Sequence, residues 1–148
     1  MKIAVACDHA GFSLKGVVLE SILQAGHYAI DLGTDNTDRV DFPDFAEKGA
    51  RFVQEGKADR AILMCGSGIG VSITANKING IYASVCHDTY SARQGVEHDD
   101  MNVLCLGGKV IGTELAKELV KAFLNASFNG LENQKRRVDK IKKLEINI

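Results

Sequence analysis

The sequence predicts an α/β fold: a three-layer α/β/α sandwich around a Rossmann-like, five-stranded parallel sheet, with a C-terminal helical tail. Short apolar runs alternate with helix-like stretches along the chain, which is typical of successive βαβ units. Most of the apolar runs lack regular polar alternation, as expected of parallel strands that helices cover on both faces. The chain has 148 residues, 45% of them hydrophobic, which suits one domain with a proper core.

The predicted strands are short apolar runs separated by stretches long enough for a helix. Right-handed crossover connections are expected to join them into one sheet. The five runs are residues 2–7, 27–32, 60–65, 81–86 and 102–107.

The stretches between these runs have helical periodicity. In the first, apolar residues recur at i, i+3, i+4 and i+8 from Leu14, which is one face of a helix. Gly26 stands where a helix C-cap belongs, and Pro43 suits a first helical turn. The predicted helices are residues 12–26, 43–56, 70–77, 89–98 and 112–127.

One domain is predicted for residues 1–148, with residues 1–126 as the α/β core and residues 127–148 as a basic tail. The tail carries six cations against three carboxylates. A solvated helix face is one interpretation of this charge, and anion binding in a neighbouring subunit is the other. The cations are Lys135, Arg136, Arg137, Lys140, Lys142 and Lys143.

The composition argues against several function classes. A net charge of −1 and a pI of about 6.4 give no positive field for nucleic acid or an anionic membrane. The tail also lacks the interleaved aromatic residues that stack on bases. The N-terminal apolar run ends at Asp8 after five residues, too short for a signal peptide, and no apolar run approaches 18 residues. We therefore expect a cytoplasmic protein.

The four cysteines and four histidines form no metal-ligand pattern, so no metal is predicted. In a reducing compartment the cysteines should be free thiols, and small buried hydrophobic residues by default.

Polar and reactive residues collect where the predicted strands end. Ligands of open parallel sheets bind outside the carboxyl ends of the strands. Asp8 and His9 follow the first strand, Cys65 ends the third, and His87 follows the fourth. This clustering predicts a ligand site at that edge.

The third strand leads into glycines at 66, 68 and 70, a spacing that fits neither the dinucleotide nor the nucleotide-triphosphate loop. Glycines here allow backbone N–H groups to approach a phosphate or a reaction oxyanion at a helix N-terminus. A tight turn that needs positive φ is the alternative. The positive end of the following helix would favour the thiolate form of Cys65, a competent base or nucleophile.

His98, just before the fifth strand, has an imidazole suited to proton transfer near neutral pH. A histidine that caps a helix C-terminus is the alternative. Asp99 and Asp100 could orient it or be solvated.

Four segments together resemble ribose-5-phosphate isomerase type B, in a family that also holds allose-6-phosphate and galactose-6-phosphate isomerases. The resemblance runs in order from Met1 to about Ile141 and is weakest in the tail. The segments are ACDHAGFSLK, CGSGIGVSITANK, EHDDMNVLCLGGKVIG and the basic C-terminal segment.

The resemblance implies interconversion of ribose 5-phosphate and ribulose 5-phosphate through an enediol, with no metal and no cofactor. Cys65 matches the family's base and His98 its ring-opening acid/base. Asp8 and His9 match substrate-contacting residues. The anion hole would be the loop of Gly66, Ser67, Gly68, Ile69 and Gly70, in which serine stands where threonine is usual.

Family members are dimers whose site borrows residues from the partner, so the resemblance implies a homodimer or a dimer of dimers. The tail would then reach a partner subunit, with Arg137 binding phosphate, or Arg136 if the alignment slips by one.

The chain also departs from the family pattern. Lys109 and Asp99, both assigned to substrate binding, replace a usual arginine and asparagine, and Phe42 replaces a common tyrosine. The segment GLEN at 130–133 stands where GGRH is usual. A 6-phospho-hexose or another aldose is therefore the alternative substrate, and a non-catalytic phosphate-binding module the alternative class.

Overall fold

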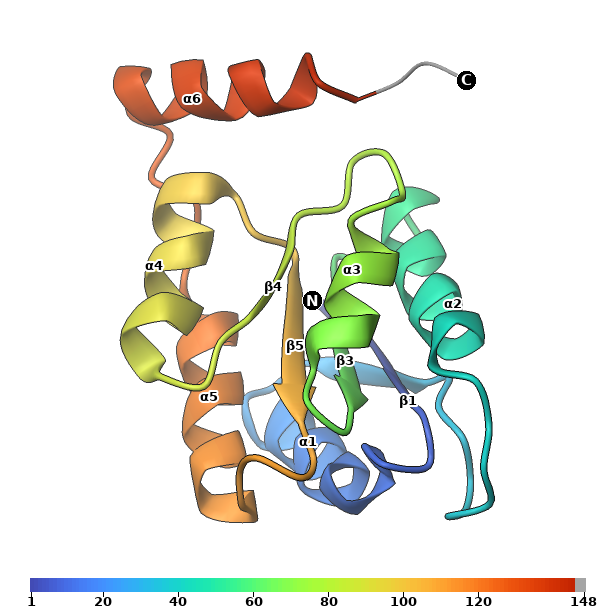
Figure 1. Ribbon diagram of the computed structural model, residues 1–148. Coiled ribbons are helices and arrows are strands. Elements are labelled where there is room, and N and C mark those ends of the chain that lie inside the picture. Colours follow the sequence, from blue (N-terminus) through green and yellow to red (C-terminus); the bar gives the residue numbers. More distant parts are fainter. Residues whose placement is uncertain (146–148) are drawn as a thin grey trace.

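The computed structural model describes residues 1–145 and contains one five-stranded parallel sheet in the order β2-β1-β3-β5-β4. This confirms the predicted fold class, including the C-terminal helix that follows the sheet (Figure 1). The strands are β1 (Lys2–Cys7), β2 (Tyr28–Asp31), β3 (Arg60–Cys65), β4 (Ala83–Val85) and β5 (Val103–Gly107). The helices are α1 (Phe12–Gln24), α2 (Phe42–Gln54), α3 (Ile69–Ala75), α4 (Thr89–Asp99), α5 (Thr113–Asn125) and α6 (Glu132–Lys142).

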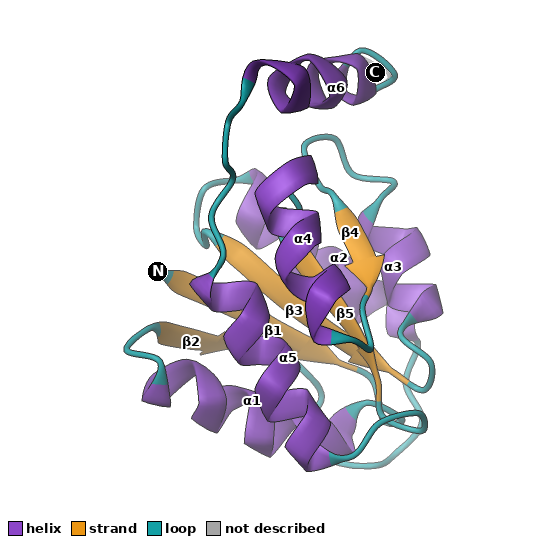
Figure 2. Cartoon of the chain, turned by 90° about the vertical axis from the view of Figure 1, so that its left-hand side faces the viewer, coloured by secondary structure: helices purple, strands orange, loops and turns teal. Residues whose placement is uncertain are grey.

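The two faces of the sheet pack against different helices, which gives the three layers seen in Figure 2. Alternate residues of β1 divide between them, because successive side chains of a strand point to opposite faces. Ile3 and Val5 join the cluster with α1, α4 and α5, whereas Ala4 and Ala6 join the cluster with α2 and α3. The central strands are thus covered on both sides, which explains their continuous apolar runs.

The edge strands are shorter than the sequence predicted. β2 covers four residues and β4 covers three, against six predicted for each. Each pairs with a single neighbour in the sheet, so its ends have a hydrogen-bonding partner on one side only. Short edge strands are also a common way to prevent further strand pairing.

Helix ends follow the predicted signals. Gly26 has a φ of +83° directly after the C-cap of α1, and Pro43 lies in the first turn of α2. Asp88 is the N-cap of α4, where its carboxylate accepts the Ser91 N–H at 3.0 Å. These caps set where each helix leaves the edges of the sheet, and so where the loops between the elements begin.

Candidate active site

The loops that follow β1, β3 and β5 meet at the carboxyl edge of the sheet. The N–H of Asp8 donates to the carbonyl of Met64 at 3.2 Å. The N–H of Gly108 donates to the carbonyl of Cys65 at 2.8 Å, and that of Lys109 to the carbonyl of Gly66 at 3.0 Å. Backbone hydrogen bonds therefore hold the three loops together before any side chain is considered.

Gly68 accounts for the tight turn between β3 and α3. Its φ is +81°, a conformation that side-chain-bearing residues rarely adopt. Gly66 and Gly70 lie outside that region of φ, so the turn alone does not explain them. Close approach explains Gly70, where a Cβ would lie 2.7 Å from the Phe42 ring, whereas a Cβ on Gly66 would be in ordinary contact with the Lys109 stem at 3.5 Å.

Close approach also fixes glycine at the end of β5. A Cβ on Gly107 would lie 2.8 Å from the backbone of Ser67. The glycine loop therefore rests directly on the last residue of the neighbouring strand. Sequence reasoning did not identify this role, although the pair Gly107–Gly108 at a strand end is the signal that could have revealed it.

We expect Gly107→Ala to push the glycine loop away from β5, because the new Cβ would overlap backbone atoms that cannot rotate aside. Overpacking of this kind costs about 1–3 kcal/mol of folding free energy. The loss of catalytic efficiency, expressed as a free energy, should exceed the loss of folding free energy, since the displaced loop adjoins Cys65. Thermal unfolding and steady-state kinetics of the variant measure both effects.

Gly16→Ala is the matched control for that substitution. Nothing lies within 4 Å of a Cβ at Gly16, in the middle of α1. Replacing a helical glycine there should stabilise the fold by about 0.4–1 kcal/mol and leave activity unchanged. Equal behaviour of the two variants would contradict the close-approach argument.

Cys65 ends β3 with its side chain directed at the glycine loop. The residue is 5% exposed, and its Sγ accepts the N–H of Gly68 at 3.2 Å. The Ser67 hydroxyl accepts the N–H of Ile69 at 3.1 Å. The Sγ therefore lies against the first amides of α3, in the place where the sequence predicts a base. All four cysteines are free thiols, as predicted.

Asp8 and His9 lie beside this loop on the turn between β1 and α1. The buried Asp8 carboxylate accepts the N–H groups of Ala10 and Gly11, both at 2.9 Å, which holds the turn. The Nδ1 of His9 accepts the N–H of Val40 at 3.2 Å. In the neutral ring the proton then sits on Nε2, leaving an N–H donor on the other side of the imidazole.

His87 is a residue of this edge to which the sequence assigned no role. Its Nε2 accepts the N–H of Gly107 at 3.0 Å, so the ring fastens the strand end under the glycine loop. Burial lowers the pKa of His87 below its ordinary value. The signal in the sequence is its place directly after a strand.

Stability should therefore decrease on acidification through the ordinary titration range of His87, near pH 6.5. Below that pH the unfolded chain binds the proton that the folded chain excludes, so protonation stabilises the unfolded state relative to the folded state. Above about pH 7.5 the ring is neutral in both states and contributes no pH dependence.

Urea unfolding of the wild type and of His87→Gln at pH 7.5 and 5.5 measures this difference. The glutamine should accept the Gly107 N–H at both pH values and reduce the loss. The same pH dependence in both proteins would contradict the assignment to His87.

His98 and Asp99 lie far from Cys65. α4 starts at the carboxyl edge of the sheet, and its 11 residues carry the chain about 16 Å to the opposite, amino edge. There His98 occupies the last turn, with Nδ1 2.9 Å from Gln94 Nε2, and Asp99 is exposed. Asp100, with φ of +55°, ends the helix. The structure thus does not bring Cys65 and His98 together within one chain.

α6 lies at this same amino edge, as Figure 1 shows. The N–H of Asn129 donates to the carbonyl of Glu97 at 2.9 Å, just before the helix. Beyond it, the Glu145 carboxylate accepts the Gly80 N–H at 2.9 Å and the Tyr82 hydroxyl at 2.8 Å. The chain just before α6 is therefore bonded to the last turn of α4, and the chain just after it to the loop that leads into β4, both at the amino edge.

The helix between those attachments is mostly solvent-exposed. Gln134 and Val138 are buried, whereas Arg136 and Arg137 are both exposed. The candidate site residues thus form two groups. Asp8, His9, Cys65, the loop 66–70 and Lys109 lie at the carboxyl edge; His98, Asp99 and Arg137 lie at the amino edge.

Within residues 1–145, no three histidine, cysteine or acidic side chains gather in a way that could hold a metal ion. No helix among these residues is long and apolar enough to span a membrane.

Comparisons with known proteins cover nearly the whole chain. Residues 3–141 match the family described as Ribose/Galactose Isomerase. Ribose-5-phosphate isomerase B of Escherichia coli is 45% identical over 135 residues, 91% of each protein. A D-erythrulose-4-phosphate isomerase of Pectobacterium atrosepticum is 43% identical over 131 residues, 88% of this chain and 86% of that protein.

The comparison of structures points to the same family as the comparison of sequences. The type B ribose 5-phosphate isomerase of Trypanosoma brucei superimposes with a TM-score of 0.95 at 40% identity, covering 97% of this chain and 98% of that one. The similarity therefore includes the sheet, the loops at its carboxyl edge and the C-terminal helix. The chain belongs to the ribose/galactose isomerase family and is an aldose–ketose isomerase of the ribose-5-phosphate isomerase B type.

Proposed function

We propose that this isomerase interconverts ribose 5-phosphate and ribulose 5-phosphate through an enediol, with Cys65 as the base. The observation that carries the proposal is the Cys65 thiol, whose Sγ lies 3.2 Å from the Gly68 amide at the start of a glycine loop. A proton next to a carbonyl is only weakly acidic, so its removal needs a base and stabilisation of the oxyanion that forms. Both are available in one stretch of chain.

The loop from Gly66 to Gly70 supplies the oxyanion donors in this proposal. The first amides of a helix have no acceptor within the helix, so those at the start of α3 that do not already donate to Cys65 Sγ or the Ser67 hydroxyl can bind an anion. Removing one such donor typically costs about 2.7–4 kcal/mol of barrier. Cys65 then moves the proton between C1 and C2 of the bound sugar, taking it from one carbon and returning it to the other.

Three neighbouring side chains are assigned to the substrate. His9 directs its Nε2 donor at a sugar oxygen, since Nδ1 is occupied by Val40. Asp8 holds the turn that carries His9. Lys109, whose stem passes over Gly66, binds anionic substrate oxygens as a single charge.

A complete site requires two chains. In the proposed mechanism His98 opens the sugar ring and Arg137 binds the phosphate, with Arg136 as the alternative to Arg137. These residues lie at the opposite edge of the sheet from Cys65, about 16 Å away along β3. A second copy related by a twofold axis would bring its amino edge to the first copy's carboxyl edge, and the reverse, giving two equivalent sites.

Exposed apolar side chains around the glycine loop support such a pairing. Ile69 and Ile73 on α3 are 56% and 59% exposed, and Val110, next to Lys109, is 59% exposed. Large exposed apolar side chains that gather near a site commonly mark a protein interface. A homodimer, alone or within a dimer of dimers, is therefore the proposed assembly.

A tetrose phosphate is the second candidate substrate. A relative named D-erythrulose-4-phosphate isomerase is 43% identical, almost as similar as the Escherichia coli ribose-5-phosphate isomerase B. Lys109 and the segment 130–133 depart from the pattern that the ribose enzymes usually show. A substrate of different length places its phosphate at a different distance from the reacting carbons, so the phosphate-binding residues are where the site would change. The same holds for a 6-phospho-hexose.

The test is a substrate panel under identical conditions. Ribose 5-phosphate, D-erythrulose 4-phosphate, allose 6-phosphate and galactose 6-phosphate are compared by kcat/KM. The proposal expects the pentose to be the best substrate. A higher value for the tetrose or a hexose would replace it by that substrate. Binding of sugar phosphates with no turnover of any would leave only a binding module.

A further inference from the structure

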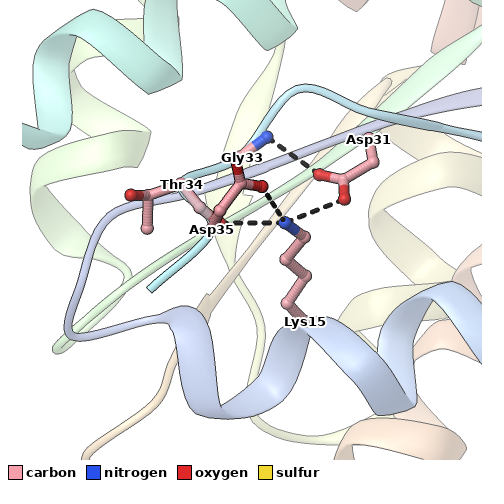
Figure 3. A network of polar contacts seen from close by, with 5 residues as sticks. All are labelled: Lys15, Asp31, Gly33, Thr34 and Asp35. Carbon is pink, nitrogen blue, oxygen red and sulfur yellow. Dashed lines mark hydrogen bonds and ion pairs between the residues drawn. The ribbon is translucent and has the colours of Figure 1, made fainter. Parts of the chain in front are cut away.

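Lys15 is a buried cation for which the proposed reaction has no use. It lies in α1, and its side chain is 9% exposed. Figure 3 shows its ammonium group among three acceptors: Asp31 Oδ2 at 2.8 Å, the Thr34 carbonyl at 2.8 Å and Asp35 Oδ1 at 3.4 Å. A buried charge is costly unless it is paired and hydrogen-bonded, so these contacts form a specific constraint.

The Lys15 ammonium group keeps its proton in the folded protein. Burial alone would lower the pKa of this ammonium group, but the hydrogen bond and charge of Asp31 outweigh burial, and the pKa is raised. The three acceptors therefore face a permanent cation at any working pH.

Those acceptors belong to the end of β2 and the first residues of the segment 32–41. This segment leads from an edge strand to α2 with neither helix nor strand in it. Its first residues are held by β1, where the N–H of Leu32 donates to Val5 at 2.8 Å and that of Thr34 to Cys7 at 3.0 Å. The Lys15 contacts add three side-chain restraints at the point where the segment leaves the sheet.

The far end of the same segment reaches the site. The Val40 N–H donates to His9 Nδ1 at 3.2 Å. Two residues further, the ring of Phe42 lies against Gly70. The path of the segment thus decides whether an N–H group stands opposite the His9 ring. Lys15 and His9 are also close along the chain, since His9 lies in the turn that leads into α1.

We propose that Lys15 is a positioning residue that fixes the segment 32–41 and, through the Val40 N–H, the orientation and tautomer of the His9 ring. The inference rests on the proposed function, in which the Nε2–H of His9 contacts the sugar phosphate. Lys15 itself touches no reacting atom. It acts on the site through the hydrogen bond from the Val40 N–H to His9 Nδ1, at the other end of the segment.

The test replaces Lys15 by methionine, which keeps the unbranched apolar stem and removes the charge. Lys48→Met on the exposed face of α2 is the matched control. Thermal unfolding establishes that each variant is folded. Asp31→Asn, a milder change that weakens the same network, provides the measurement if Lys15→Met does not fold.

Two readouts separate positioning from general destabilisation. The first is the imidazole nitrogen spectrum of His9, which should show the Nε2–H tautomer in the wild type and Lys48→Met and a mixture in Lys15→Met. The second is a double-mutant cycle on kcat/KM with ribose 5-phosphate. We expect Lys15→Met to lower kcat/KM about tenfold in the wild type, but by less than about twofold in a His9→Ala background.

An equal loss in both backgrounds, or an unchanged His9 spectrum in folded Lys15→Met, would overturn the inference. Failure of the proposed function has a different signature, because the wild type would then turn over no ribose 5-phosphate. In that case the His9 spectrum alone decides whether Lys15 positions the ring.

Discussion

Cys65→Ala should abolish isomerisation of ribose 5-phosphate while leaving the fold intact. Removing a positioned acid–base group typically lowers kcat by about 10²–10⁴-fold. The loss is expected in kcat because, in the proposed site, the loop, the neighbouring side chains and the partner's cations would bind the sugar phosphate, and the substitution removes none of them. The small cavity left by one sulfur atom at the end of β3 should cost little stability.

Steady-state kinetics and calorimetric binding of ribose 5-phosphate, measured on the same preparation, test this expectation. Cys86→Ala is the control, since Cys86 is an equally buried free thiol at the end of another strand. It should retain wild-type kcat within about twofold. A Cys65→Ala protein that keeps more than about a tenth of wild-type kcat would show that another group is the base.

Mixing two inactive variants should restore activity if each site draws on two chains. Cys65→Ala lacks the proposed base, and His98→Asn lacks the proposed ring-opening group. In a heterodimer of the two, one site carries both substitutions and the other carries neither. Random pairing of equal amounts makes half of the dimers mixed, so about one quarter of wild-type activity should return.

Co-expression with two different tags, followed by tandem purification, isolates the mixed dimers. Their activity should then approach about half that of the wild type, one intact site out of two. As a control, the double variant Cys65→Ala with His98→Asn in one chain is paired with wild-type chains. Each of its two sites then carries one substitution, so it should show little activity. Mixed dimers of the single variants with no activity would place both groups in sites built by one chain.

Several elements of the fold could be predicted because their causes are local. Continuous apolar runs predicted the covered central strands, and Gly26 and Pro43 predicted helix ends that the structure contains. The lengths of β2 and β4 could not be predicted. They depend on which strands lie at the edge of the sheet, and strand order is a long-range property.

Residue chemistry and strand ends together predicted that Asp8, His9 and Cys65 would gather at one edge of the sheet. The side chains that support this edge, His87 and Lys15, were not predicted as such. A histidine after a strand and a lysine in a helix have no distinctive pattern. Their roles come from acceptors and donors that approach from other loops.

Periodicity, glycine spacing and motif order are properties of contiguous residues, so they predicted the class of fold, the glycine loop after Cys65 and the resemblance to sugar-phosphate isomerases. The need for glycine at position 107, and the place of His98 and α6 at the opposite edge from Cys65, follow from the packed fold alone. These facts depend on how strands and helices of fixed length are laid side by side. A helix that starts at one edge of a parallel sheet ends at the other, so Cys65 and His98, which belong to successive motifs, become separated by the length of the strands.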